Sequence, residues 1–228
     1  MTLQLPLAGL LLLATSVLPA RAASASYELD PVHTRVMVAV EHAGFSRALG
    51  TVSGSTGHLQ FDPEDWTTAR LEVSVPLQRI DFGDGKWNQA VTAANLLDAA
   101  SHPFAKFVST RIEPIDPQHA TVHGTLTLHG ISREVQLKVT LNALKRHPMP
   151  PFRRTVGFSA TAELSRADFG IDAWKSVIGD RVELRMEVEA TRSRAGNTDI
   201  DADTDTDAAE AQADDPAQPV PTTEPATP

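Results

Sequence analysis

The side chains best suited to chemistry in this sequence are its eight histidines. His33 and His42 lie at the two ends of a predicted strand, and His123 and His129 stand six residues apart. A zinc site on a helix uses histidines one turn apart, as in the H-E-x-x-H motif, and the sequence has no such pair. We therefore predict structural or exposed histidines and no metal site. His42 is the exception, because the strand pattern turns it inward, where it can meet a polar group of a bound molecule.

Patterns of nucleophilic catalysis are missing as well. The chain has no cysteine and no G-x-S-x-G sequence, which excludes disulfides, a thiolate site and a serine elbow. Asp81-Phe82-Gly83 and Asp168-Phe169-Gly170 match a kinase tripeptide, but no glycine-rich phosphate loop accompanies them, so we predict turns there. Arg166 and Asp168 are expected to brace the end of a strand through charge-assisted hydrogen bonds. The sequence thus predicts no catalytic residues and no cofactor.

The segment 1–22 is predicted to be a signal peptide. Its apolar run from Leu5 to Leu18, about 14 residues, is too short to span a bilayer comfortably. Ala20-Arg21-Ala22 follows and matches the small-x-small pattern of a signal peptidase site. We expect export to the periplasm, a mature chain that begins at Ala23, and no transmembrane segment after cleavage.

The segment 193–228 has a different composition from the rest of the chain. It contains nine acidic residues and one basic residue, with few branched apolar side chains. Such a segment cannot bury enough apolar surface to offset its ordering entropy, so we predict a disordered acidic tail rich in Pro, Ala and Thr. Residues 27–192 hold 18 basic and 20 acidic residues, a net charge of −2. A domain so close to neutral offers no basic face for nucleic acid.

Strands must position the remaining residues, and the clearest lie between His119 and Leu144. Apolar or small residues alternate with polar ones on both sides of His129-Gly130, which supplies a tight corner. A period of two places one set of side chains on a buried face and the other in water. The inward set is Val122, Gly124, Leu126, Leu128, Val135, Leu137, Val139 and Leu141. This pattern predicts a β-hairpin.

The same alternation recurs along the chain and predicts about eight long strands. The others cover residues 36–40, a run rich in Gly, Ser and Thr at 50–61, and residues 69–77, 104–112, 156–164 and 182–190. Uneven apolar positions around Phe107 predict a bulge in the strand 104–112. Between 83 and 100, apolar residues recur every three or four positions, which favours one or two short helices.

Long one-sided strands with a single helical insertion predict an all-β fold. The absence of strand-helix-strand alternation argues against a parallel sheet. A two-sheet sandwich or a closed barrel satisfies such strands, and a barrel of eight leaves room for side chains or one slender ligand. Small residues at 50–61 and an aromatic content of only 5% favour a barrel with a cavity.

Several short motifs, taken in order, are similar to those of a known family. They are Leu29-Asp30-Pro31-Val32-His33-Thr34, Glu41-His42-Ala43-Gly44-Phe45-Ser46, Ser101-His102-Pro103, Phe107-Val108-Ser109-Thr110, and the runs 124–130 and 165–171. Together they resemble the YceI-like family of periplasmic polyisoprenoid-binding proteins, over roughly residues 27–192. The resemblance implies an extended, lipocalin-like, eight-stranded antiparallel β-barrel that holds a long isoprenoid or similar amphiphile in its lumen.

The helical segment departs from the family pattern. The family often has an Arg-Asp pair and a His-Leu pair there, where this chain has Asp84-Gly85-Lys86-Trp87-Asn88-Gln89. Trp87 is expected to form part of the pocket lid. The resemblance therefore carries over the fold but not the contacts to a ligand's head group.

These observations predict an exported binding protein rather than an enzyme. Its ligand would be a polyisoprenoid of the quinone or polyprenyl type, or a similar long amphiphile, held for transport, storage or stress protection. The predicted ligand-binding residues are Val36, Val38, Val40, His42, Leu71, Val73, Val75, Trp87, Phe107, Leu126, Leu128, Leu137, Val139, Phe158, Leu184 and Met186. A lipid-modifying enzyme, a ligand-free structural or stress-response domain, and a homodimer stay open.

Overall fold

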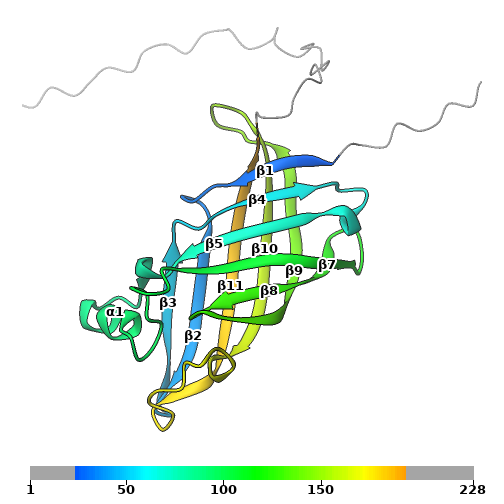
Figure 1. The fold of residues 1–228 in the computed structure, drawn as a ribbon. Helices are drawn as coiled ribbons and strands as arrows, with labels where there is room; N and C mark the ends of the chain where they lie inside the picture. Colours follow the sequence, from blue (N-terminus) through cyan, green and yellow to red (C-terminus); the bar gives the residue numbers. More distant parts are fainter. Residues whose placement is uncertain (1–23, 194–228) are drawn as a thin grey trace, which may run out of the picture. The chain divides into compact units, whose positions relative to one another are not determined.

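The computed structural model describes residues 24–193, so the predicted signal peptide and all of the predicted tail except Ser193 lie outside the described residues. Residues 24–193 form one antiparallel sheet that is wound into a closed barrel (Figure 1). The strands are β1 Ala25–Leu29, β2 Arg35–His42, β3 Ser46–Ser53, β4 Thr56–Phe61, β5 Arg70–Pro76, β6 Ile80–Asp81, β7 Phe104–Pro114, β8 His119–Leu128, β9 Ile131–Arg146, β10 Arg154–Ser165 and β11 Ile178–Arg192. Three 3-10 helices, η1 Trp66–Thr68, η2 Leu77–Arg79 and η3 Arg166–Phe169, and the α-helix α1 Gly85–Thr92 connect them.

Eight of these strands form the closed ring. Their order is β1-β4-β5-β7-β8-β9-β10-β11, and β1 pairs back onto β11. Beyond β1, the same edge of β11 pairs with β2, which is followed by β3 and the short β6. These three strands lengthen the barrel wall on one side of the ring. The predicted all-β, eight-stranded antiparallel barrel with a helical insertion is confirmed.

Strand β1, which closes the ring, was not among the predicted strands. Tyr27 and Leu29 are buried, and they pair with Arg192 and Ala190 of β11. On its other edge, Tyr27 pairs with Leu59 of β4. Three alternating apolar or small residues in a five-residue segment give too short a pattern to predict a strand. The pairing of β1 with β11, far away in the sequence, holds β1 in the sheet.

The predicted strand at 50–61 is divided into β3 and β4. The division falls at Gly54, whose φ of +78° lies in the left-handed region that favours glycine. The Gly54 N–H donates to the carbonyl oxygen of Pro31 at 3.2 Å, outside the regular ladder. The break lets the chain leave β2, the partner of β3, and pair with β1 through β4.

Two predicted details of the strands are confirmed. The β8-β9 hairpin turns at His129 and Gly130, both at positive φ. The bulge in β7 lies between Ser109 and Arg111, where the register against β8 shifts. There the hydroxyl of Ser109 accepts a hydrogen bond from the N–H of Leu71 at 2.9 Å. The Ser109 hydroxyl thus serves as the acceptor for the Leu71 N–H beside the bulge.

The helical segment contains one α-helix, where one or two were expected. The carboxylate of Asp84 accepts hydrogen bonds from the N–H groups of Lys86 and Trp87 and so caps α1. Turns follow from 93 to 101, and they bury Leu96 and Ala99. Within residues 24–193, no helix is both long and apolar enough to cross a membrane.

Candidate functional site

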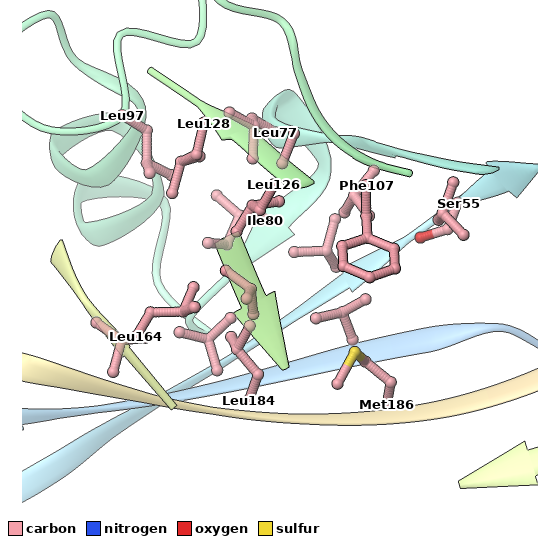
Figure 2. Close-up of a pocket in the computed structure, with 18 of the residues that line it drawn as sticks. Ser55, Leu77, Ile80, Leu97, Phe107, Leu126, Leu128, Leu164, Leu184 and Met186 are labelled. Atoms are coloured by element: carbon pink, nitrogen blue, oxygen red, sulfur yellow. The ribbon is translucent and has the colours of Figure 1, made fainter. Parts of the chain in front are cut away.

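The barrel encloses a cavity of about 640 Å³, within the range of about 300–1,000 Å³ typical of small-molecule sites. Its wall consists mainly of inward-facing side chains of the strands, joined by side chains of the helices and connecting turns such as Leu77 and Leu97 (Figure 2). All sixteen predicted ligand-binding residues line it: Val36, Val38, Val40, His42, Leu71, Val73, Val75, Trp87, Phe107, Leu126, Leu128, Leu137, Val139, Phe158, Leu184 and Met186. The structure thus brings the predicted set together around one space. That they contact a ligand stays a prediction.

Strand alternation explains why this wall is apolar. On β2, Val36, Val38 and Val40 line the cavity, whereas Met37 between them has 37% of its surface exposed. Successive side chains of a strand point to opposite faces of the sheet, so every second residue reaches the lumen. The valines therefore meet the other inward faces rather than water.

Aromatic side chains fill the lumen near the end of β4. Phe61 lies edge-on to Trp66 and Phe158, with ring centroids 5.1 and 5.4 Å apart, and Trp66 lies 6.1 Å from Phe158. All three are buried and line the cavity. Edge-to-face contacts of this kind favour a rigid cluster. We call Phe61, Trp66 and Phe158 the closed end.

The cavity reaches the surface at the other side, beside α1. Trp87 of α1 and Trp174 in the loop before β11 line the cavity and are 41% and 61% exposed. The ring of Trp87 stands 5.4 Å from His42 and 6.1 Å from Phe82. We call this region, defined by His42, Phe82, Trp87 and Trp174, the mouth. His42 and Trp87 line the cavity there, and the lid role of Trp87 stays a prediction.

One asparagine ties α1 to the barrel wall. The Asn88 side-chain oxygen accepts from the N–H of Phe82 at 2.7 Å, and its amide nitrogen donates to Asp81 Oδ1 at 2.9 Å. The bond from Asn88 and a second from the N–H of Gly83 hold the pKa of Asp81 below its ordinary value. The helix therefore has a fixed anchor beside the mouth.

Arg166 is a buried arginine that lines the cavity, only 6% exposed. Its guanidinium donates to three carbonyl oxygens, those of Ile171 at 2.7 Å and of Ile178 and Gly179 at 2.9 Å. The predicted bracing role of Arg166 is confirmed, with backbone oxygens as partners. The N–H of Asp168 donates to Ser165 Oγ at 3.4 Å, a bond that does not involve its carboxylate, so the charge-assisted role of Asp168 stays a prediction.

Asp180 completes this bracing. The hydroxyl of Ser165 and the N–H of Ala167 donate to its carboxylate, and these bonds hold the pKa of Asp180 below its ordinary value. The Ala167 N–H lies 3.0 Å from Asp180 Oδ1. Because η3 and β11 are joined in this way, the rim of the barrel is fixed on the side of Arg166.

Close packing between neighbouring strands depends on two glycines. A Cβ at Gly124 would lie 2.3 Å from the ring of Phe107, and a Cβ at Gly50 would lie 2.8 Å from the ring of Phe82. Both rings line the cavity. Glycine at these positions therefore leaves space for aromatic side chains from other elements. The small residues predicted to leave space at 50–61 do so for Phe82.

The rings of His102 and His129 contact each other, with centroids 5.4 Å apart, and other histidines pair with acidic residues near them in the sequence or on a neighbouring strand. His33 Nδ1 lies 2.8 Å from Asp30 Oδ2, a hydrogen bond that raises the pKa of His33. His123 Nε2 lies 2.9 Å from Glu113 Oε2. Across residues 24–193, no group of three or more His, Cys, Asp or Glu converges as a metal site would require.

Polar side chains in the cavity wall are few. They are Thr34, Glu41, His42, Ser55, Asn95 and Arg166. Sequence reasoning did not assign Ser55, which lies in the run of small residues at 50–61, or Trp66 of the closed end. Neither position continues a long alternating pattern. A wall of this composition suits an apolar ligand. It offers carbon surface for contact, and it has few polar groups that would bind water in the cavity.

Comparison with known proteins agrees with this geometry. The model of the YceI-like domain matches residues 27–190. The chain belongs to the YceI-like family. A UPF0312 protein of Pseudomonas savastanoi pv. phaseolicola is 31% identical to it over 164 residues, covering 71% of this chain and 84% of the relative. A UPF0312 protein of Pseudomonas putida is 29% identical over 187 residues, covering 81% and 96%.

The barrel of this YceI-like protein is also similar to solved structures. The crystal structure of Burkholderia cenocepacia BcnA aligns with a TM-score of 0.64 and 23% identity, covering 72% of this chain and 99% of that one. A polyisoprenoid binding domain from Saccharophagus degradans, implicated in plant cell wall breakdown, aligns with a TM-score of 0.55 and 13% identity, covering 74% and 99%. At these identities the likeness shows a shared fold.

Proposed function

We propose that this YceI-like protein is an exported, periplasmic binding protein that holds a polyisoprenoid, or a similar long-chain amphiphile, in the barrel lumen. The carbon-lined cavity of about 640 Å³ carries the proposal. Its wall supplies apolar contact along a lumen that ends on buried aromatic rings and opens beside Trp87. The solved polyisoprenoid binding domain with the same fold supports this ligand class. Export rests on the N-terminal sequence, and a first residue of Ala23 in protein recovered from the periplasm would support it.

The energetics favour a long chain. Each buried CH₂ contributes about 0.8 kcal/mol, so a chain of ~20 carbons gains roughly 16 kcal/mol before other terms are counted. Loss of chain flexibility and of free tumbling removes much of this gain. Half of it corresponds to a Kd of about 1 μM. A ligand of this kind would stay bound during purification at ordinary protein concentrations.

Blocking the lumen tests the proposal. Val73 lines the cavity and pairs with Phe107, so Val73→Trp would place an indole in the lumen. Val108 on the neighbouring strand is 45% exposed, and Val108→Trp is the matched control. We expect an isoprenoid-like amphiphile in the organic extract of the wild type and of Val108→Trp, and little in that of Val73→Trp. Mass spectrometry identifies the lipid, and circular dichroism checks that all three proteins fold alike.

Two other outcomes would favour a different function for this protein. If none of the three proteins carries lipid or takes up an added polyprenyl compound, the binding proposal fails and a ligand-free structural barrel is the better account. Turnover of a bound lipid into a new product would instead indicate a lipid-modifying enzyme.

A further inference from the structure

The hairpin of β9 and β10 ends in a tip whose charged side chains are all basic. Residues 145–154 contain four Lys or Arg residues, one His and no acidic residue, and the nearest acids along the chain are Glu134 and Glu163. None of the four Lys and Arg side chains forms an ion pair with another described residue. We call residues 145–154 the basic tip. A near-neutral total over the whole domain does not exclude such a local excess of charge.

Two of these cations face each other across the hairpin. Arg146 of β9 and Arg154 of β10 are paired in register, and both are exposed. Like charges directly opposite each other on neighbouring strands destabilise a sheet. Arg146 Nε donates to the carbonyl oxygen of Phe152 at 3.1 Å, whereas Arg153 Nε is buried without a hydrogen-bond partner among the described residues. A bound anion would relieve the repulsion between Arg146 and Arg154.

The basic tip lies at the end of the barrel away from the mouth. Figure 1 shows the loop between β9 and β10 extending past β1. Strand β11 connects the two ends, because its Thr191 pairs with Thr155 next to the tip and its Ile178 pairs with His42 of the mouth. A partner that binds the tip therefore leaves the mouth uncovered.

Apolar side chains in the tip indicate which kind of anionic partner fits. Met149 and Phe152 are 61% and 49% exposed, and in the sequence they stand between the two pairs of cations. Nucleic acid would contact the cations through its phosphates and leave these two side chains in water. A bilayer that contains anionic phospholipid offers phosphate groups to the cations and acyl chains to Met149 and Phe152. The combination of charge and apolar surface thus favours a lipid surface.

We propose that the basic tip docks this protein on a membrane surface that contains anionic phospholipid. Its Lys and Arg side chains contact lipid phosphates, and Met149 and Phe152 enter the boundary between head groups and acyl chains. The chain as a whole has a net charge of −9, but charges farther away than about 8 Å are largely screened at physiological ionic strength, so the local charge of the tip governs the contact. This interaction goes beyond the proposed function and does not depend on what the lumen holds.

Co-sedimentation of the full chain with vesicles tests the proposal. The vesicles are phosphatidylcholine alone or phosphatidylcholine mixed with phosphatidylglycerol. We expect binding to the mixed vesicles at low salt, a strong reduction at high salt, and little binding to phosphatidylcholine alone. The double variant Arg146→Gln, Arg154→Gln should bind the mixed vesicles about thirtyfold more weakly, which corresponds to about 1 kcal/mol for each arginine. Its melting temperature should be unchanged or higher, because the facing like charges are gone.

The double variant Arg47→Gln, Arg181→Gln is the matched control. It removes the same number of positive charges, but Arg47 and Arg181 lie outside the tip and form ion pairs with Glu183 and Glu163. It should bind the mixed vesicles as tightly as the wild type. Inorganic phosphate, added at constant ionic strength, should not displace the wild type from them, because it offers nothing to Met149 and Phe152.

A fluorescent label reports which end of the barrel meets the membrane. The chain has no cysteine, so Met149→Cys and Phe45→Cys each supply a single attachment point. Phe45 lies in the β2-β3 turn, three residues after His42 of the mouth, and is 91% exposed. The emission of an environment-sensitive dye at position 149 should shift to shorter wavelength on the mixed vesicles. The same dye at position 45 should show no shift.

Several outcomes would overturn the proposal. If the wild type does not bind the mixed vesicles at low salt, binds both kinds of vesicle equally or is displaced by phosphate, the tip is not a membrane-docking surface. The same holds if the two double variants lose affinity equally. A shift of the dye at position 45 alone would place the mouth against the membrane, and tighter binding to a DNA duplex would assign the tip to nucleic acid. The proposed function is tested separately by lipid extraction from Val73→Trp.

Discussion

At the scale of single residues, the guanidinium group of Arg166 joins η3 to the loop that follows it and to the start of β11. The planar fork of arginine presents five N–H donors in fixed directions, and Arg166 directs three of them to the carbonyls of residues 171, 178 and 179. These carbonyls belong to the loop after η3 and to the start of β11. These carbonyl oxygens do not accept from a neighbouring strand. They accept from the side chain of Arg166 instead.

Arg166→Met tests this role. Methionine keeps much of the buried volume but leaves carbonyl oxygens unpaired, so we expect a loss of about 2–5 kcal/mol in the free energy of unfolding. Since about 1 kcal/mol shifts a domain of this size by roughly 2–4 °C, thermal denaturation will resolve it. Arg181→Gln is the control, because Arg181 is exposed and pairs with Glu163 at the surface. Equal melting temperatures for the two variants would show that the carbonyl bonds contribute little.

The motif around Arg166 shows how far residue-level prediction reaches. A charged side chain within Ser165-Arg166-Ala167-Asp168-Phe169-Gly170 predicted a brace at a strand end, and the structure has one. The partners were not predictable, because backbone oxygens carry no signature in the sequence. Ser55 escaped prediction for a related reason. Its burial depends on the break at Gly54 and on the lumen behind it, which are properties of the closed barrel.

At the scale of elements, period-two alternation was sufficient to assign the faces of the long strands. On β9, Val135 and Leu137 are buried and Lys138 is exposed, as the pattern predicted. Alternation is a local property, so it needs no knowledge of the partner strand. The short β1 and the division between β3 and β4 depend on pairing partners far away in the chain, and these features were missed.

A pair of substitutions on β9 tests the register directly. Val139 lines the cavity between Ala120 and Ala160, and Lys138 is an exposed neighbour. We expect Val139→Asp to destabilise the barrel by several kcal/mol, because it buries an unpaired carboxylate. Lys138→Asp should change stability by about 0.5 kcal/mol or less. Urea denaturation of both variants measures the difference. Coincident unfolding curves would mean that the strand is shifted by one residue.

At the scale of the barrel described by residues 24–193, the lumen has one end filled by aromatic rings and one mouth beside α1. Composition and alternation predicted a barrel with a cavity, and the structure has both. Which end of the cavity is closed was not predictable, because Phe61, Trp66 and Phe158 come from separate elements and meet only in the folded chain. This arrangement has a kinetic consequence, since a ligand must enter and leave past Trp87 and Trp174.

Trp87→Ala therefore should speed ligand exchange. Trp87 lines the cavity at the mouth and packs near His42 and Phe82, so its removal widens the exit while the wall farther inside stays intact. We expect the dissociation rate of a fluorescent long-chain probe to rise about five- to tenfold, measured by stopped-flow transfer to excess lipid vesicles. Association should accelerate too, so that the equilibrium affinity falls by a smaller factor. Phe45→Ala is the matched control, because Phe45 is an aromatic residue in the β2-β3 turn, 91% exposed and not part of the cavity wall. An unchanged rate in Trp87→Ala, or an equal acceleration in Phe45→Ala, would place the exit route elsewhere.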